Sequence, residues 1–195
     1  MTKQHIKSKK GFTIIEVVLV LAIAGLILLM AIMAFPRLQK TTYDTQRKDD
    51  MDTLVASLMN YESSNRGVLP SATWTGVVTG YESKSEAENH YIANNEAGEW
   101  GRFYVNYILT GSEAFLDPDG TPYNIGVYQC GATNTGDDCV AGVQVRDLTF
   151  EDNDHTARVV VNAKCDGDRA VKSTGPRQFA VLYRLEINGT FCAAN

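Results

Sequence analysis

Glu16 is the most unusual chemical group in this sequence, because it is an acid near the start of a long apolar run. From Val17 to Pro36 the chain has twenty residues without a charge. A charged side chain deep in a bilayer costs about 2.5–3.5 kcal/mol, so an acid within a membrane segment indicates a functional role. The alternative is that Glu16 simply lies at the level of the lipid headgroups.

Asp117 and Asp119 form a second chemical pattern, because they precede Gly120 in the stretch LDPDGTPY. Alternating carboxylates before a glycine could offer oxygen ligands to calcium. The other positions of a calcium loop and its closing glutamate are missing. A β-turn with Pro118 second and Gly120 fourth explains the same residues. We favour the turn, keep calcium at Asp117 and Asp119 as the weaker hypothesis, and expect no other metal site.

Motifs that would carry catalysis are missing from the sequence. It has no Gly-x-Ser-x-Gly elbow, no phosphate-binding glycine loop and no His-x-x-x-His pair. Carboxylates are plentiful, but an acid–base site depends on shape and desolvation, which a sequence does not show. The sequence therefore predicts a protein that is not an enzyme and needs no cofactor.

The N-terminus begins with a basic segment and continues with the apolar run. Residues 1–11 hold four lysines and no acid. An ordinary secretory signal starts in the same way, but its apolar core has about 7–15 residues and a small-x-small cleavage site follows. The run from Val17 to Pro36 is longer, and at 1.5 Å per residue it reaches about 30 Å, one hydrocarbon thickness. We expect a cleaved leader over 1–11 and a membrane-spanning helix over 12–36.

The order Lys10-Gly11-Phe12-Thr13-Ile14-Ile15-Glu16 before that run resembles the class III leader of type IV pilins and of the pseudopilins of type II secretion. The resemblance implies that a prepilin peptidase cuts after Gly11 and methylates the new amine of Phe12. It also implies that Glu16 guides an incoming subunit into a filament. Glycine leaves room for a peptidase at the scissile bond. The Phe12 amine and Glu16 carry opposite charges one helical turn apart.

The same resemblance implies a location, partners and a function. The precursor would be a single-pass protein of the inner membrane, handled by the peptidase and the pilus assembly machinery. Copies would then join through their N-terminal helices into an extracellular type IV pilus-like filament. One alternative is a pseudopilin of a type II secretion system, because the stretch Asp117–Tyr123 is similar to one in major pseudopilins. Another is a minor pilin that binds a host surface or DNA through the bases of Arg158–Arg184.

Charge is distributed unevenly over the part of the chain that follows the helix. Acids outnumber bases over residues 82–154, and bases outnumber acids over 158–184. Two faces of opposite sign would suit contacts between neighbouring subunits, although ordinary solvated charges explain them as well. The net charge of −5 argues against nucleic acid as the main partner.

Four cysteines lie in the last third of the chain. An even number without a Cys-x-x-Cys pair, in a chain with an export segment, favours disulfides over zinc. Four cysteines allow three pairings. We favour Cys130–Cys139, which closes a turn-rich segment, and Cys165–Cys192, which ties the last strand to an earlier one, but the sequence leaves the pairing open.

Residues 37–66 contain neither glycine nor proline and predict a continuation of the helix. Its first part is a polar stem. An apolar stripe at spacings of three and four then predicts packing on a sheet. Gly67 and Pro70 should end the helix. Pro36 predicts a kink or a melted stretch near 32–36, or simply a bend where the helix leaves the membrane. The stripe consists of Met51, Leu54, Val55, Leu58 and Tyr61.

Residues 67–195 predict a globular, β-rich head, which gives an α+β protein with the pilin fold and an antiparallel sheet. Short alternating runs separated by Gly, Asn, Asp and Pro are typical of strands. Asn188-Gly189 predicts a tight hairpin between the last two strands. Residues 82–100 are expected to form a helix or a long loop. The expected strands are 103–109, 126–129, 142–150, 158–163, 179–187 and 190–194.

Overall fold

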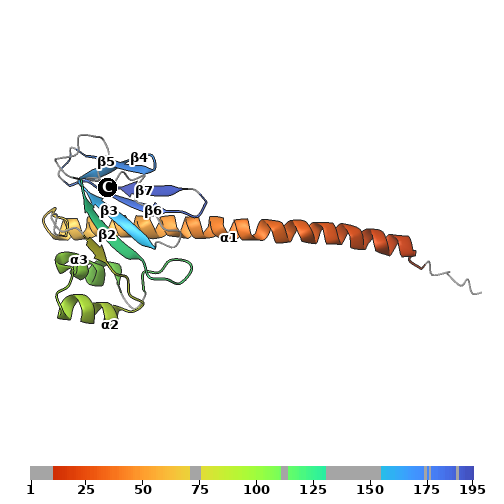
Figure 1. The fold of residues 1–195 in the computed structure, drawn as a ribbon, viewed down its shortest axis with the longest axis horizontal. Coiled ribbons are helices and arrows are strands. Elements are labelled where there is room, and N and C mark those ends of the chain that lie inside the picture. The colour runs from red at the N-terminus through yellow and green to blue at the C-terminus, as the bar shows by residue number, and fades with distance from the viewer. Residues whose placement is uncertain are drawn as a thin grey trace, which may run out of the picture. The chain divides into compact units, whose positions relative to one another are not determined.

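The computed structural model describes residues 11–70, 76–110, 114–130, 155–173, 175, 177–187 and 189–195 (Figure 1). The chain forms two units, one up to Lys40 and one over Thr41–Asn195. The second unit is the head, and it includes the last part of the long helix. The strand expected over 142–150 lies outside the described residues.

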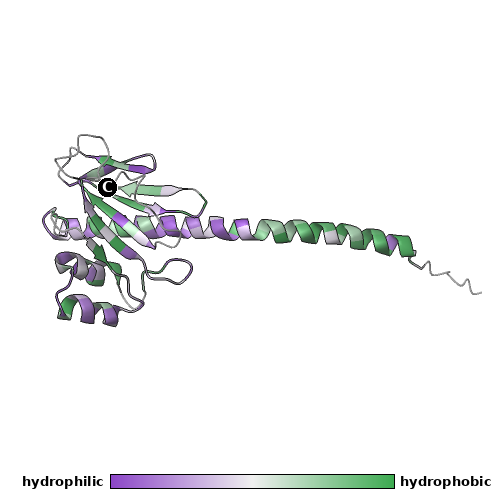
Figure 2. Cartoon of the chain, in the orientation of Figure 1, coloured by the Kyte–Doolittle hydropathy of each residue, from purple (hydrophilic) through white to green (hydrophobic). Residues whose placement is uncertain are grey.

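Helix α1 runs without interruption over Ile14–Ser64. Its first part is apolar and the part after Pro36 is polar, as the change of colour along the ribbon shows (Figure 2). The melted stretch predicted near Pro36 is not there, because Pro36 lies inside the continuous helix. Proline removes one backbone donor and crowds the preceding turn. The strong helix formers on both sides, such as Ala34 and Leu38, keep the remaining bonds in place.

The last part of α1 packs on the sheet through the predicted apolar stripe. Met51, Leu54 and Leu58 are fully buried, and Val55 is nearly so. The helix then ends where predicted, just before Gly67. The Gly67 N–H donates to the Glu62 carbonyl over 2.8 Å, and Arg66 adopts a left-handed φ of 61°, which together form a Schellman ending.

The described residues of the head form a five-stranded sheet in the order β1-β2-β3-β6-β7. All pairs are antiparallel except β2 and β3, which run parallel from Asn124↔Thr156 to Gln129↔Val161. The predicted antiparallel sheet is therefore correct for three of its four pairs. A parallel pair needs a long connection, and 26 residues separate these two strands in the sequence. The strands are β1 (Gly76–Val78), β2 (Asn124–Gln129), β3 (Thr156–Val161), β6 (Phe179–Arg184) and β7 (Thr190–Ala194).

Both faces of this sheet are covered. On one face, side chains of β3 such as Val159 join the α1 stripe in the main core. On the other face, Val160 packs with Ala163 and Ala170 of a two-stranded hairpin, which the sequence did not predict. That hairpin consists of β4 (Ala163–Asp166) and β5 (Arg169–Lys172). The central strand β3 is consequently buried at every position.

A helical lobe replaces the strand predicted over 103–109, which was wrong. It comprises α2 (Lys84–Ala87), π-helix η1 (Glu88–Ala93), α3 (Gly98–Phe103) and π-helix η2 (Tyr104–Ile108). Trp100, Phe103 and Tyr104 are fully buried, at the i, i+3, i+4 spacing of a helix face. The strand prediction began at Phe103 and so left out Trp100, the residue that reveals this period.

Candidate functional site

Thr13 and Glu16 form a capping box at the start of α1. The Glu16 N–H faces the Thr13 hydroxyl oxygen at 3.4 Å. In return, Glu16 Oε2 accepts from the Thr13 N–H at 3.2 Å and from its hydroxyl at 3.1 Å. This reciprocal arrangement satisfies backbone donors that a helix N-terminus otherwise leaves unpaired. The Thr-x-x-Glu spacing was readable in the sequence, but our sequence interpretation missed it.

Gly11 and Phe12 lie just before the helix, in backbone without regular structure. Phe12 is 89% exposed. Among the described residues, apart from its chain neighbours, a Cβ placed on Gly11 would meet no atom within 4 Å, so they leave that side of the backbone open. Residues 1–10 of the expected leader lie outside the described residues. The two predicted processing residues, Gly11 and Phe12, thus precede the helix, and the predicted assembly residue Glu16 lies in its first turn, bound to Thr13.

An exposed apolar surface follows directly after the capping box. The large apolar side chains from Val17 to Met33 are each about half to two-thirds exposed. An 18-residue window of α1 has a mean hydropathy of 3.1 and none of it is buried. By length and composition this helix could cross a membrane. An apolar surface of this extent requires lipid or other helices around it.

Residues 6–32 match the family model of the prokaryotic N-terminal methylation motif. The chain carries a class III prepilin leader. This prepilin leader supports a membrane-anchored, pilin-like or pseudopilin precursor that a prepilin peptidase processes. Neither curated proteins nor solved structures give a significant match to the chain.

Beyond the prepilin leader, the head contains a polar clasp that joins α1 to two loops. Arg47 of α1 donates to both oxygens of Asp117, from Nε over 2.7 Å and from Nη2 over 2.9 Å. Its Nη1 donates to Glu186 over 2.9 Å. Asp44 accepts the N–H groups of Glu186 and Ile187. The clasp is completed by hydrogen bonds from Tyr183 to Asp117 and from Tyr123 to Asp50.

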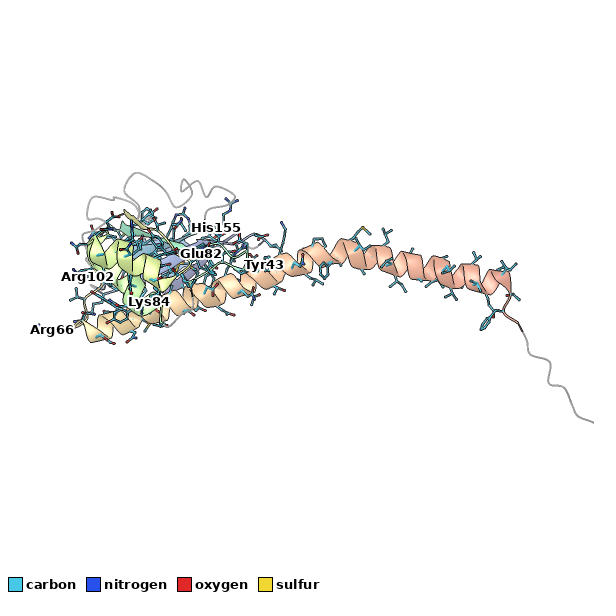
Figure 3. The ribbon with its side chains drawn as sticks, turned by 90° about the horizontal axis from the view of Figure 1, so that it is seen from below. Tyr43, Arg66, Glu82, Lys84, Arg102 and His155 are labelled. Carbon is cyan, nitrogen blue, oxygen red and sulfur yellow. A yellow bond between two sulfur atoms is a disulfide. The ribbon has the colours of Figure 1, made fainter. Side chains whose placement is uncertain are left out.

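The clasp depends on the α1 spacing of Asp44, Arg47 and Asp50, which places three polar side chains on one face of the helix. Figure 3 shows Tyr43 near the start of this part of α1 and Arg66 at its end. Asp117 is 2% exposed and Arg47 is 6% exposed. Removing one partner of such a buried pair leaves an uncompensated charge, which costs about 3–5 kcal/mol. The clasp therefore fixes the loops against the helix.

Burial and hydrogen bonding act in opposite directions on the carboxylates of the clasp. Burial alone would raise the pKa of Asp117, but the hydrogen bonds from Arg47, the Asp119 N–H and Tyr183 together lower this pKa below its ordinary value. Burial raises the pKa of Asp50, and the hydrogen bond from Tyr123 only partly offsets it. Asp117 thus remains ionised beside Arg47.

The turn interpretation of Asp117–Gly120 is confirmed by geometry. The Gly120 N–H donates to the Asp117 carbonyl over 2.8 Å, and Gly120 has a φ of 93°. Asp117, Asp119 and His155 do lie close enough together to be considered as metal ligands. Each Asp117 oxygen, however, already accepts two hydrogen bonds, and Arg47 supplies a positive charge there. This occupancy does not support the calcium hypothesis.

The disulfide Cys165–Cys192 is present, as predicted, and links β4 to β7. Cys130 is also disulfide-bonded. Its expected partner Cys139 lies outside the described residues. The confirmed bond holds the β4–β5 hairpin against the edge of the sheet. The head is therefore covalently tied between β4 and β7.

Of the six basic residues expected to bind DNA, Arg158 is buried, whereas Lys164, Arg169, Lys172, Arg177 and Arg184 are exposed. Arg158 is only 5% exposed within β3. The Arg177 guanidinium packs against the backbone of Gly67, so that even a Cβ on that glycine would collide with it. Arg158 is therefore withdrawn from a binding surface, whereas the exposed bases remain available to the binding-module alternative.

Proposed function

We propose that this chain is the precursor of a structural subunit in a type IV pilus-like extracellular filament. The observation that carries the proposal is the continuity of the methylation motif with an exposed apolar helix. Cleavage after Gly11 and methylation of Phe12 would precede assembly. The precursor is anchored in the inner membrane by α1, and the filament is helical and built from copies of the same chain.

Glu16 supplies the specific attraction in this proposal. Cleavage after Gly11 creates an amine at Phe12, which is positively charged. In an apolar surrounding an unpaired carboxylate is costly, so the carboxylate of one copy and the amine of another attract each other strongly. The apolar side chains of α1 then add about 0.8 kcal/mol for each CH₂ removed from water. Electrostatics thus select the register, and packing of the helices supplies most of the assembly energy.

The protein acts by assembly rather than by catalysis in this proposal. The clasp uses its carboxylates to bind α1 to the head, and Asp117 has its oxygens filled by donors. The carboxylates of the clasp therefore have structural partners that explain them. Neither a cofactor nor a metal is required.

A pseudopilin of a type II secretion system is the second candidate. The observation that favours it is the Asp117–Tyr123 stretch, which resembles one in major pseudopilins and whose turn and clasp contacts are built into the head. Pseudopilins form short periplasmic filaments, whereas pilins form long surface filaments. Filament length and location therefore separate the two.

The decisive experiment is mass spectrometry of the mature N-terminus together with electron microscopy of the cells. We expect a chain that begins with methylated Phe12 and long filaments that contain it. Methylated Phe12 without surface filaments would favour the pseudopilin. A chain that retains Met1 in cells with an active prepilin peptidase would overturn the proposal.

A further inference from the structure

The capping box marks where the helical hydrogen bonds of α1 begin. This boundary lies close to the Gly11–Phe12 peptide bond, which is expected to be cut. The Thr13 carbonyl accepts the first helical hydrogen bonds, from the Glu16 N–H over 3.1 Å and from the Val17 N–H over 3.4 Å. Thr13 is therefore the N-cap residue, and Ile14 is the first residue of the helix. Only Phe12 lies between this cap and Gly11.

The position of the cap decides whether the scissile carbonyl is free. In an α-helix each N–H bonds to the carbonyl four residues earlier. If the helix began two residues sooner, the Ile15 N–H would bond to the Gly11 carbonyl, which belongs to the bond between Gly11 and Phe12. With Thr13 as the cap, the helical hydrogen bonds begin at the Thr13 carbonyl, and the Gly11 carbonyl lies outside the helix. The open side of Gly11 and the exposed Phe12 side chain also leave the bond accessible.

The Thr13 hydroxyl is the side-chain group that stabilises this boundary. It faces the Glu16 N–H as acceptor and donates to the Glu16 carboxylate. Phe12 cannot take over as a cap, because its side chain has no oxygen. Valine has nearly the shape of threonine but lacks the hydroxyl. A Thr13→Val chain therefore keeps the bulk at this position and loses the preference for starting the helix at Ile14.

We propose that Thr13 is a positioning residue for leader removal: through the capping box it holds the Gly11–Phe12 peptide outside the helix, where a peptidase can bind it. The proposal rests on the proposed function, since it presumes cleavage after Gly11. Thr13 acts on the conformation of the substrate and touches no reacting atom. Its loss should consequently reduce the fraction of precursor that is competent to bind.

The test measures leader removal from the full-length precursor in detergent by a purified prepilin peptidase. We expect Thr13→Val to raise KM about tenfold with kcat unchanged, because apparent affinity falls with the competent fraction. A tenfold change corresponds to about 1.4 kcal/mol, within the usual range for a lost N-cap. Thr13→Ser should restore the wild-type KM, since serine caps as well as threonine does.

A conformational readout accompanies the kinetics. A single ¹³C label at the Gly11 carbonyl should report a non-helical environment in the wild type and in Thr13→Ser, and a shift toward the helical value in Thr13→Val. The mobility of the non-reduced chain, which reports the disulfides of the head together, serves as the control that each head has folded.

The outcomes separate the two claims. Equal KM for Thr13→Val and wild type, or a serine variant no better than the valine one, overturns the role of Thr13 while leaving the prepilin proposal intact. A fall in kcat alone would also overturn it, because it would indicate a direct contact with the peptidase. A wild-type precursor that the enzyme never cuts would instead defeat the proposed function itself.

Discussion

At the scale of single residues, Glu16 has two partners at different stages. In the uncut chain it is held by the Thr13 backbone and hydroxyl. In the proposed filament it attracts the amine of another copy. The same carboxylate therefore serves local capping first and assembly later, and substitutions can separate the two roles.

Glu16→Ala should leave leader removal nearly intact and reduce filament yield severely. The Thr13 hydroxyl still caps the helix in this variant, because its acceptor role uses a backbone N–H. Glu16→Gln is the sharper comparison, since glutamine also completes a capping box but carries no charge. Pelleted filaments and the ratio of precursor to mature chain measure both effects. Normal filament yield from either variant would contradict the assembly role of the charge.

Arg47→Met should destabilise the head by about 3–5 kcal/mol, because it leaves the buried Asp117 without its cation. Unfolding by urea can be followed through the fluorescence of Trp100, which is fully buried. Arg37→Met, in the exposed part of α1, is the matched control. Equal stability of the wild type and Arg47→Met would show that the clasp is dispensable.

Asp117 should also make the head sensitive to acid. Its pKa is lowered in the folded state, so its contribution to stability is present above the unfolded pKa of about 3.9 and is lost as the pH falls through the folded value. The difference in unfolding free energy between wild type and Asp117→Asn should therefore be largest above about pH 5 and shrink below about pH 4. Burial raises the pKa of Asp50 in both chains, and the Asp117 charge adds to this rise only in the wild type, so an Asp50→Asn background isolates the Asp117 contribution. A difference independent of pH would contradict the pairing with Arg47.

At the scale of elements, the hairpin β4–β5 is attached to the sheet by packing and by one covalent bond. The disulfide closes a sequence separation of 27 residues. By the loop-entropy model a bond of this kind contributes about 3 kcal/mol. A Cys165→Ser, Cys192→Ser double variant should lose about this much, as measured by urea unfolding of the oxidised chains. No loss would indicate that Ala163 and Ala170 alone secure the hairpin.

Apolar substitutions in the first part of α1 should leave membrane insertion of the precursor nearly unchanged, whereas charged substitutions should reduce it. Ile27→Arg places a charge in the middle of the apolar segment, which costs about 2.5–3.5 kcal/mol on the insertion scale. Membrane fractionation should show markedly less inserted precursor than for Ile27→Ala, which serves as the control. Equal insertion of the two variants would argue that this segment lies outside the bilayer.

The sequence predicted those elements whose signal is local. The α1 stripe, the end of the helix at Gly67 and the β6–β7 pair all depend on residues near each other in the chain. The clasp could not be predicted, because Arg47 and Asp117 lie 70 positions apart and neither shows its burial in the sequence. Residues 103–109 of the helical lobe were mistaken for a strand, since a short window fits both periods, whereas a helix was among the alternatives for residues 82–100. The capping box was local and readable, and it was simply overlooked.

At the scale of the whole molecule, a membrane-anchored precursor carries its head on the far end of the same helix that anchors it. The clasp and the stripe make that helix part of the core of the head. The head therefore cannot be considered as a domain independent of α1. Substitutions in the stripe should affect both the stability of the head and the attachment of the head to the anchor.

The parallel pairing of β2 with β3 has a consequence for the order of folding during synthesis. β3 is the central strand, and its partners are separated from one another in the chain. Contacts between distant residues form slowly, because closing the intervening loop costs conformational entropy before any contact contributes favourable free energy. Since β7 (Thr190–Ala194) is the last strand of the described sheet in chain order, the sheet is complete only after all the preceding residues have emerged. An incomplete translation product would thus remain anchored but unfolded, and it would expose its strands to quality-control proteases.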